Sequence, residues 1–145
     1  MIAYAESSAV LRWLFNEPAG EEILDHLRGA RKVVCSRLTL IECQRAVRRA
    51  AAESRMSEAD LGDLRAVLAQ AAARWAVVEL SRDVAERAAA RFPVEPVRTL
   101  DAVHLASMVV VRESLADLVV LSTDDRVRAN SEQLGFTVLP VAVPR

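Results

Sequence analysis

Short apolar runs that alternate with longer amphipathic segments constrain most strongly what this chain can fold into. Most of these runs are continuously apolar, as is typical of strands covered by helices on both faces of a parallel sheet. The alternation of strand and helix therefore predicts an α/β fold with a central sheet between two layers of helices. The predicted strands are residues 1–5, 33–35, 76–80, 118–121 and 136–139.

Helical periodicity fills the intervals between the predicted strands, and turn residues mark where each helix ends. Pro93 and Pro96 place residues 92–96 in a loop, because proline is excluded from helix interiors. Gly29 and Gly135 follow the last periodic residues of two helices, which is the usual place for a helix-ending glycine. The predicted helices are residues 6–15, 19–28, 39–55, 58–74, 82–91, 99–111 and 124–134, and the predicted N-caps include Ser36, Ser57 and Ser81.

Length and composition predict one soluble domain over residues 1–145. Hydrophobic residues make up 52% and charged residues 27% of the chain, which is enough of each for a globule with a core. No apolar run approaches the roughly 20 residues that cross a bilayer, and Glu6 near the start argues against a signal peptide. We therefore expect a cytoplasmic protein with no membrane partner.

The charge of the chain is nearly balanced, at −1. This value does not indicate a nucleic-acid binder, although a local basic patch is sufficient for binding. All the basic residues except Lys32 are arginine, which binds phosphate through two parallel hydrogen bonds; the bias of a GC-rich genome is the favoured explanation. Arg45, Arg48 and Arg49 share one helix face, for which solvation is favoured over binding of RNA or a partner.

The two cysteines, Cys35 and Cys43, do not have metal-binding spacing. Neither histidine lies near them in the sequence, so a zinc site is not expected. We expect two buried, reduced thiols.

Acidic residues are predicted to gather at the carboxyl ends of the strands, where ligands bind in parallel sheets. Glu6 follows the first strand, and Asp124 and Asp125 follow the strand at 118–121. Glu42 and Asp101 lie among apolar residues of two helices, where a buried acid requires a balancing cation. Such a group of oxygen ligands favours Mg²⁺ or Mn²⁺. Taken singly, each acid is equally consistent with a turn, a helix start or a solvated helix face.

These acids stand in four segments that resemble the motifs of one family, the PIN-domain nucleases, and more narrowly the VapC-type toxins of bacterial toxin–antitoxin pairs. The opening segment resembles the family's first motif, an acid, any residue, then Ser or Thr, which matches Glu6 and Ser8. The segment that contains Asp101 is very similar to the third motif and is the most specific match. The four segments are residues 1–11, 36–42, 98–106 and 121–127, and their matched acids are Glu6, Glu42, Asp101 and Asp124.

The resemblance implies a three-layer α/β/α PIN-like fold with a mostly parallel sheet of about five strands. It implies an Mg²⁺- or Mn²⁺-dependent endoribonuclease that inhibits translation, with one or two ions held by the four matched acids. Ser8 and Ser122 would orient the carboxylates. It also implies a homodimer and a cognate VapB-type antitoxin that covers the acidic pocket.

The first acid departs from the family pattern, because Glu6 stands where the family mostly has Asp. A catalytically weakened PIN-like module that binds RNA or protein is therefore the alternative. Glu6→Asp is expected to retain or raise activity, and a complete loss would show that the longer carboxylate is required.

Several further residues are assigned less directly. Arg126 is the candidate phosphate contact, with a surface salt bridge as the alternative, and Asp125 is an additional candidate acid. For His104, packing is favoured over a hydrogen bond to a site carboxylate. Residues 13–15, Trp-Leu-Phe, are candidates for a partner groove, with core packing favoured for at least one of them.

Overall fold

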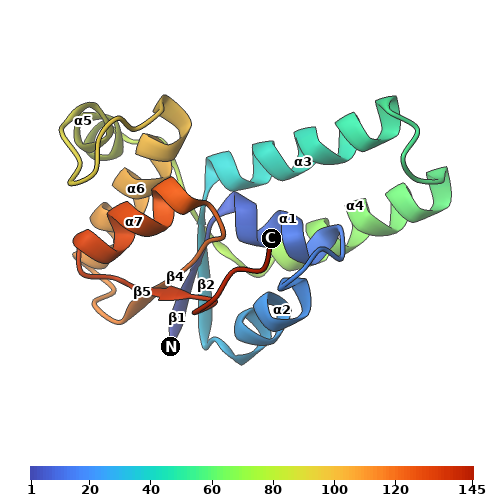
Figure 1. The fold of residues 1–145 in the computed structure, drawn as a ribbon, viewed down its shortest axis with the longest axis horizontal. Coiled ribbons are helices and arrows are strands. Elements are labelled where there is room, and N and C mark those ends of the chain that lie inside the picture. Colours follow the sequence, from blue (N-terminus) through green and yellow to red (C-terminus); the bar gives the residue numbers. More distant parts are fainter.

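Five parallel strands form one sheet at the centre of the molecule (Figure 1). The computed structural model describes all residues from 1 to 145. The strand order is β3-β2-β1-β4-β5, so β1 lies in the middle with β2 on one side and β4 on the other. The strands are β1 (Ile2–Ala5), β2 (Lys32–Ser36), β3 (Ala76–Val78), β4 (Leu118–Leu121) and β5 (Thr137–Leu139).

Seven helices cover the two faces of this sheet, which confirms the predicted three-layer α/β/α fold. In Figure 1, α5, α6 and α7 lie on one side of the sheet, and α1 to α4 lie on the other. The helices are α1 (Ser7–Leu14), α2 (Gly20–Gly29), α3 (Arg37–Ala52), α4 (Glu58–Ala72), α5 (Arg82–Ala89), α6 (Thr99–Arg112) and α7 (Asp125–Gln133).

Alternate residues of β1 enter two separate cores, which is the two-residue period of a strand. Ile2 and Tyr4 pack with residues of α5, α6 and α7. Ala3 and Ala5 pack with residues of α1 to α4. All four side chains are fully buried, which explains why the run is continuously apolar.

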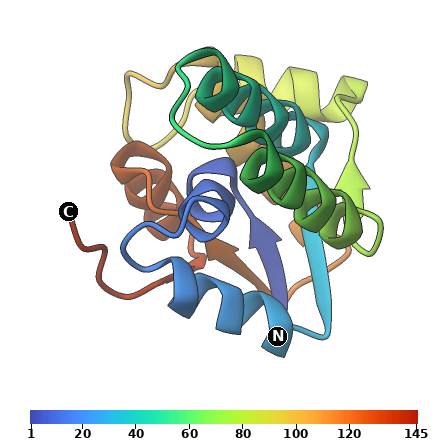
Figure 2. The same ribbon diagram turned by 90° about the vertical axis from the view of Figure 1, so that its right-hand side faces the viewer.

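Helices α3 and α4 form a long antiparallel pair that extends beyond the sheet, and Figure 2 shows them side by side. A small separate cluster of Val47, Ala50 and Leu61 holds the outer end of this pair together. A groove of about 340 Å³ lies between the two helices, with Arg48 and Arg65 among the residues that line it.

The helix starts follow the capping residues predicted from the sequence. Ser36, Ser57 and Ser81 each accept a hydrogen bond from a backbone N–H in the first turn of α3, α4 and α5, respectively. Gly135 has a φ of 88° just after α7, which glycine adopts without strain. Gly20 lets α2 approach α1 closely, since a Cβ there would clash with the carbonyl oxygen of Arg12.

Cys35 and Cys43 are free and buried, as predicted. Both lie in the core on the α1 to α4 side of the sheet. No helix of the structure is long and apolar enough to cross a membrane.

Candidate functional site

Glu6 and Asp124 lie at the ends of two adjacent strands, at the point where the strand order reverses. Glu6 directly follows β1 and caps α1, because its side chain accepts a hydrogen bond from the backbone N–H of Ser8. Asp124 follows β4 and caps α7 by accepting from the N–H of Val127 at 2.9 Å. In open parallel sheets this position forms the ligand-binding crevice. We call the region around Glu6, Glu42, Asp101 and Asp124 the acidic pocket.

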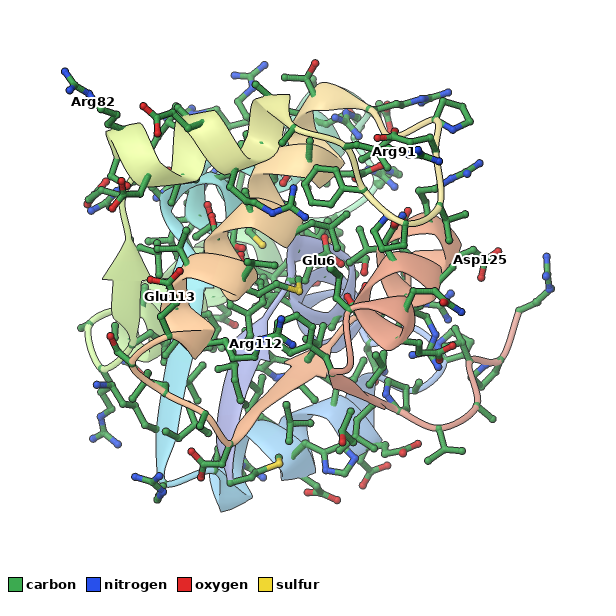
Figure 3. All side chains as sticks on the ribbon, turned by 90° about the vertical axis from the view of Figure 1, so that its left-hand side faces the viewer. Glu6, Arg82, Arg91, Arg112, Glu113 and Asp125 are labelled. Atoms are coloured by element: carbon green, nitrogen blue, oxygen red, sulfur yellow. The ribbon has the colours of Figure 1, made fainter.

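Glu6 is the most buried of the matched acids, with 4% of its surface exposed. Figure 3 shows it inside the molecule, among the helices and strand ends of the pocket. The hydroxyl groups of Ser8 and Ser122 both donate to Glu6 Oε2, the latter at 2.8 Å. Burial raises the pKa of Glu6, although the charge of His104 and these hydrogen bonds act in the opposite direction. The predicted contacts of both serines with a site carboxylate are therefore present.

Glu42 projects from α3 and is held by two side chains from other helices. His104 Nε2 lies 2.6 Å from Glu42 Oε1, and the Ser7 hydroxyl donates to the same oxygen at 2.7 Å. Burial alone would raise the pKa of Glu42, but these hydrogen bonds outweigh it and leave the pKa below its ordinary value. Glu42 is thus a partly buried carboxylate fixed through a single oxygen, rather than a residue on a solvated face.

His104 is fully enclosed in the protein, and the interpretation favoured from its sequence, packing alone, is incomplete. Its Nε2 also lies 3.8 Å from Glu6 Oε1, and its Nδ1 lies 3.4 Å from the Tyr4 hydroxyl. Burial lowers the pKa of His104, but the hydrogen bond to Glu42 and the charges of Glu6, Glu42 and Asp101 outweigh burial and raise it. His104 is therefore a buried hydrogen-bonding partner of the pocket's acids, which favour its protonated form.

Asp101 lies in the first turn of α6 and is half-buried. Burial raises its pKa, and the negative charges of Asp124 and Glu42 add to this effect. The charges of His104 and Arg98 partly offset it. The structure thus brings together the acids of the third and fourth motifs, which are 23 positions apart in the sequence.

Some predicted residues lie outside this constellation. Asp125 is exposed, and Figure 3 shows it on the outer side of the molecule, away from Glu6. Arg126 is also exposed, and the arginine whose charge acts on Asp101 is Arg98, at the start of α6. Sequence reasoning missed Ser7 and Arg98, although both stand directly beside predicted motif residues.

The acidic pocket contains more carboxylates than nearby cations. Carboxylate oxygens are the ligands that Mg²⁺ and Mn²⁺ prefer, and burial together with the charges of Asp124 and Glu42 raises the pKa of Asp101. In chemistry and charge, the residues therefore suit a divalent cation. As the side chains stand, however, no three His, Cys, Asp or Glu residues are arranged to hold a metal.

A second surface feature lies at the opposite ends of the strands. It is a groove of about 840 Å³ between α2 and α4, which we call the α2–α4 groove. Trp13 and Trp75 line it, with ring centroids 6.4 Å apart. Leu14, by contrast, is buried in the core, and Phe15 packs against the core. Of the three residues considered for a partner groove, Trp13 alone lines this one.

Basic as well as apolar side chains line the α2–α4 groove, and no acidic residue lines it. Arg31 is paired with Asp117 at 3.0 Å. The basic residues are Arg28, Arg31, Lys32 and Arg74.

The fold and the pocket together define an α/β protein with acids at the switch point of a parallel sheet. The PIN domain family model matches residues 3–133, and the chain accordingly belongs to the PIN domain family. No curated protein sequence matches the chain.

Three solved structures share this fold at low sequence identity. VapBC2 from Rickettsia felis, bound to a DNA fragment from their promoter, has a TM-score of 0.62 and 10% identity, over 95% of this chain and 97% of that chain. PAE2754 from Pyrobaculum aerophilum has a TM-score of 0.57 and 19% identity, over 96% of this chain and 84% of that chain. FitAB bound to an IR36 DNA fragment has a TM-score of 0.64 and 14% identity, over 96% of this chain and 94% of that chain.

Proposed function

We propose that this protein is a metal-dependent endoribonuclease toxin that hydrolyses RNA phosphodiester bonds and inhibits translation. The observation that carries the proposal is the group of acids at the switch point, where Glu6, Glu42, Asp101 and Asp124 converge and the charges of Asp124 and Glu42 act on Asp101. Membership of the PIN domain family supports a nuclease. In the cell we place it in the cytoplasm.

Mg²⁺ or Mn²⁺, as one or two ions, is the cofactor that this chemistry favours. Such an ion supplies a water of lowered pKa and neutralises charge on the phosphodiester. Asp101, Asp124 and Glu42 each present carboxylate oxygen to the pocket, and Glu6 completes the acidic set. These residues would hold the ion or fix the residues that hold it.

The chain's other residues orient these acids and bind the substrate. Ser8 and Ser122 hold Glu6, while Ser7 and His104 hold Glu42. Arg98 lies close enough to Asp101 to act on its charge, and it is the arginine best placed to contact an RNA phosphate. Arg126 is the second candidate for that contact.

A cognate VapB-type antitoxin is the proposed protein partner, and the active form is proposed to be a homodimer. The fold likeness to VapBC2 and FitAB supports the antitoxin. The α2–α4 groove offers apolar and basic surface that complements an acidic amphipathic helix. Because the groove and the acidic pocket lie at opposite ends of the strands, an antitoxin docked there needs a further segment to cover the pocket.

Cleavage of RNA by the purified, antitoxin-free protein tests this function. Total RNA from the source organism is incubated with Mg²⁺ or Mn²⁺, and in parallel with EDTA. We expect cuts that require the metal and are lost in Asp101→Asn, while Asp125→Asn, a matched change outside the pocket, retains them. Cleavage that survives EDTA or Asp101→Asn contradicts the assignment.

A PIN-like module that binds RNA or protein without cleavage is the second candidate function. It is favoured by one observation, that no three side chains of the pocket are arranged to hold a metal. Metal-independent RNA binding by folded protein, with no cuts under any condition, would support it.

A further inference from the structure

Glu6 differs from the other acids of the pocket in that both of its oxygens are occupied by the protein itself. Oε1 accepts a hydrogen bond from the backbone N–H of Ser8 at 3.1 Å. Oε2 accepts from the hydroxyls of Ser8 and Ser122. With 4% of its surface exposed, its carboxylate is enclosed by these donors.

The two serines connect Glu6 to the turn that leads into α7. The Ser8 hydroxyl, which donates to Glu6, accepts from the backbone N–H of Thr123 at 2.8 Å. The Ser122 hydroxyl likewise accepts from the N–H of Asp124 at 3.2 Å. Since each hydroxyl donates to Glu6, its lone pairs are directed toward the turn. Glu6 thereby fixes the backbone that presents Asp124.

The remaining acids keep oxygen atoms free of protein hydrogen bonds. Glu42 receives both of its hydrogen bonds at Oε1, which leaves Oε2 without a protein donor. Asp124 uses Oδ1 to accept from Val127 and leaves Oδ2. Asp101 is half-buried, and its carboxylate is repelled by that of Asp124. Free carboxylate oxygen in the pocket therefore belongs to these three residues.

We propose that Glu6 is a positioning residue, which orients Asp124 through Ser8 and Ser122, and that the metal ligands are Asp101, Asp124 and Glu42, whose side chains must move to surround an ion because they are not arranged to hold one as they stand. The proposal rests on the metal-dependent function proposed above and differs from the ligand role that the family resemblance implies for Glu6. It gives the extra methylene of Glu6 a purpose, because the side chain must reach from the end of β1 to Ser122 at the end of β4. It also changes what we expect of Glu6→Asp. The shorter side chain should no longer reach both serines, so the turn that carries Asp124 should lose order and activity should fall.

Amide hydrogen exchange in the metal-free protein, followed by NMR, tests the positioning role without reference to catalysis. In Glu6→Asp we expect the amides of Thr123 and Asp124 to exchange at least tenfold faster. The amide of Val120, within β4, should keep its wild-type rate. Asp125→Asn, next to the same turn, is the matched control and should leave all three rates unchanged.

Unchanged exchange at Thr123 and Asp124 in a folded Glu6→Asp protein would overturn the proposal. Should that variant not fold, Glu6→Gln keeps the length of the side chain but replaces an acceptor oxygen by a donor. The same acceleration at both amides is then expected, and its absence is equally decisive.

A crystal of the wild-type protein with Mn²⁺, located by its anomalous signal, tests the ligand assignment. We expect contacts from Asp101, Asp124 and Glu42, with Glu6 still bonded to both serines. A Glu6 oxygen at bonding distance from the ion, about 2.0–2.2 Å for a small divalent cation, overturns the assignment, as does a crystal in which no ion binds these three acids. Failure of the proposed function would give a different result. The wild-type protein would then never cleave RNA, while Glu6→Asp would still speed amide exchange at the turn.

Discussion

His104 Nε2 lies 2.6 Å from Glu42 Oε1, although the two residues are 62 positions apart in the chain. The contact joins α6 to α3 across the two helical layers. A largely buried hydrogen-bonded pair of this kind depends on both partners, because removal of one leaves a polar atom of the other without its partner.

We predict that His104→Gln lowers the free energy of unfolding by about 1–3 kcal/mol, the usual range when a buried polar group loses its partner. Urea unfolding in EDTA measures the change. His26→Gln is the matched control, since His26 Nε2 lies 3.5 Å from Glu22 Oε1 but makes no hydrogen bond, so the change removes no hydrogen-bonded partner. Equal destabilisation by both variants would show that the His104–Glu42 contact has no special weight.

The same pair predicts how stability depends on pH in the absence of metal. The folded pKa of His104 is raised, so its contribution is complete below the unfolded value of about 6.5 and is lost as pH rises through the folded pKa. The folded pKa of Glu42 is lowered, so its contribution is present above about 4.3 and is lost as pH falls through the folded pKa. We therefore expect the Tm in EDTA to be highest between these two values. The decline above pH 6.5 should be shallower in His104→Gln, and an identical decline would assign it to other groups.

The two cysteines should be unreactive in the folded protein. Burial raises the pKa of Cys35 to about 12 and moves the pKa of Cys43 upward as well, so the reactive thiolate is scarce at pH 8. We expect Ellman's reagent to detect two thiols in guanidinium chloride and essentially none within minutes in native buffer. Rapid native labelling would show that the core on the α1 to α4 side opens readily.

Gly20 and Gly62 should respond in opposite directions to the same change. Gly20→Ala places a methyl group against the carbonyl of Arg12, and we expect a loss of roughly 1–3 kcal/mol from overpacking. Gly62 lies within α4 with nothing near its Cβ position, so Gly62→Ala should stabilise by about 0.5–1 kcal/mol. Thermal unfolding of the two variants side by side measures both. A neutral Gly20→Ala would mean that α1 and α2 can separate without loss.

If the antitoxin docks in the α2–α4 groove, negative charge introduced there should weaken its binding. Val67→Asp and Arg74→Glu change exposed residues of the groove, and we expect each to weaken binding of the cognate antitoxin about tenfold, or about 1.4 kcal/mol. Arg45→Glu, on exposed surface of α3, is the control. Calorimetric titration gives the affinities, and an equal effect of all three variants would indicate general charge repulsion rather than a local contact.

The sequence was sufficient to predict the order of strands and helices, because continuous apolar runs and capping residues are local signals. Ser36, Ser57 and Ser81 cap the helices as predicted. The position of Glu6 and Asp124 at one edge also followed from local signals, since Glu6 directly follows β1 and Asp124 lies three residues after the end of β4.

The contacts within the pocket were beyond sequence reasoning, because they depend on how helices cross. Ser7 and Ser8 are adjacent, yet one hydroxyl binds Glu42 and the other binds Glu6. Which serine meets which acid is set by the rotation of α1 against α3 and β4. His104 shows the same limit, since its apolar neighbours indicate burial but not the partner that it meets there.

The place of β1 in the middle of the sheet has a consequence for the order in which the chain is made. β1 is translated early, but the neighbouring strand that completes the edge with the acids, β4, follows only at Leu118, after β2 and β3. A ribosome that stops before Asp124 releases a chain that lacks one of the four acids and the turn that Glu6 holds. The site is thus completed only after β4 and the turn that follows it have been translated.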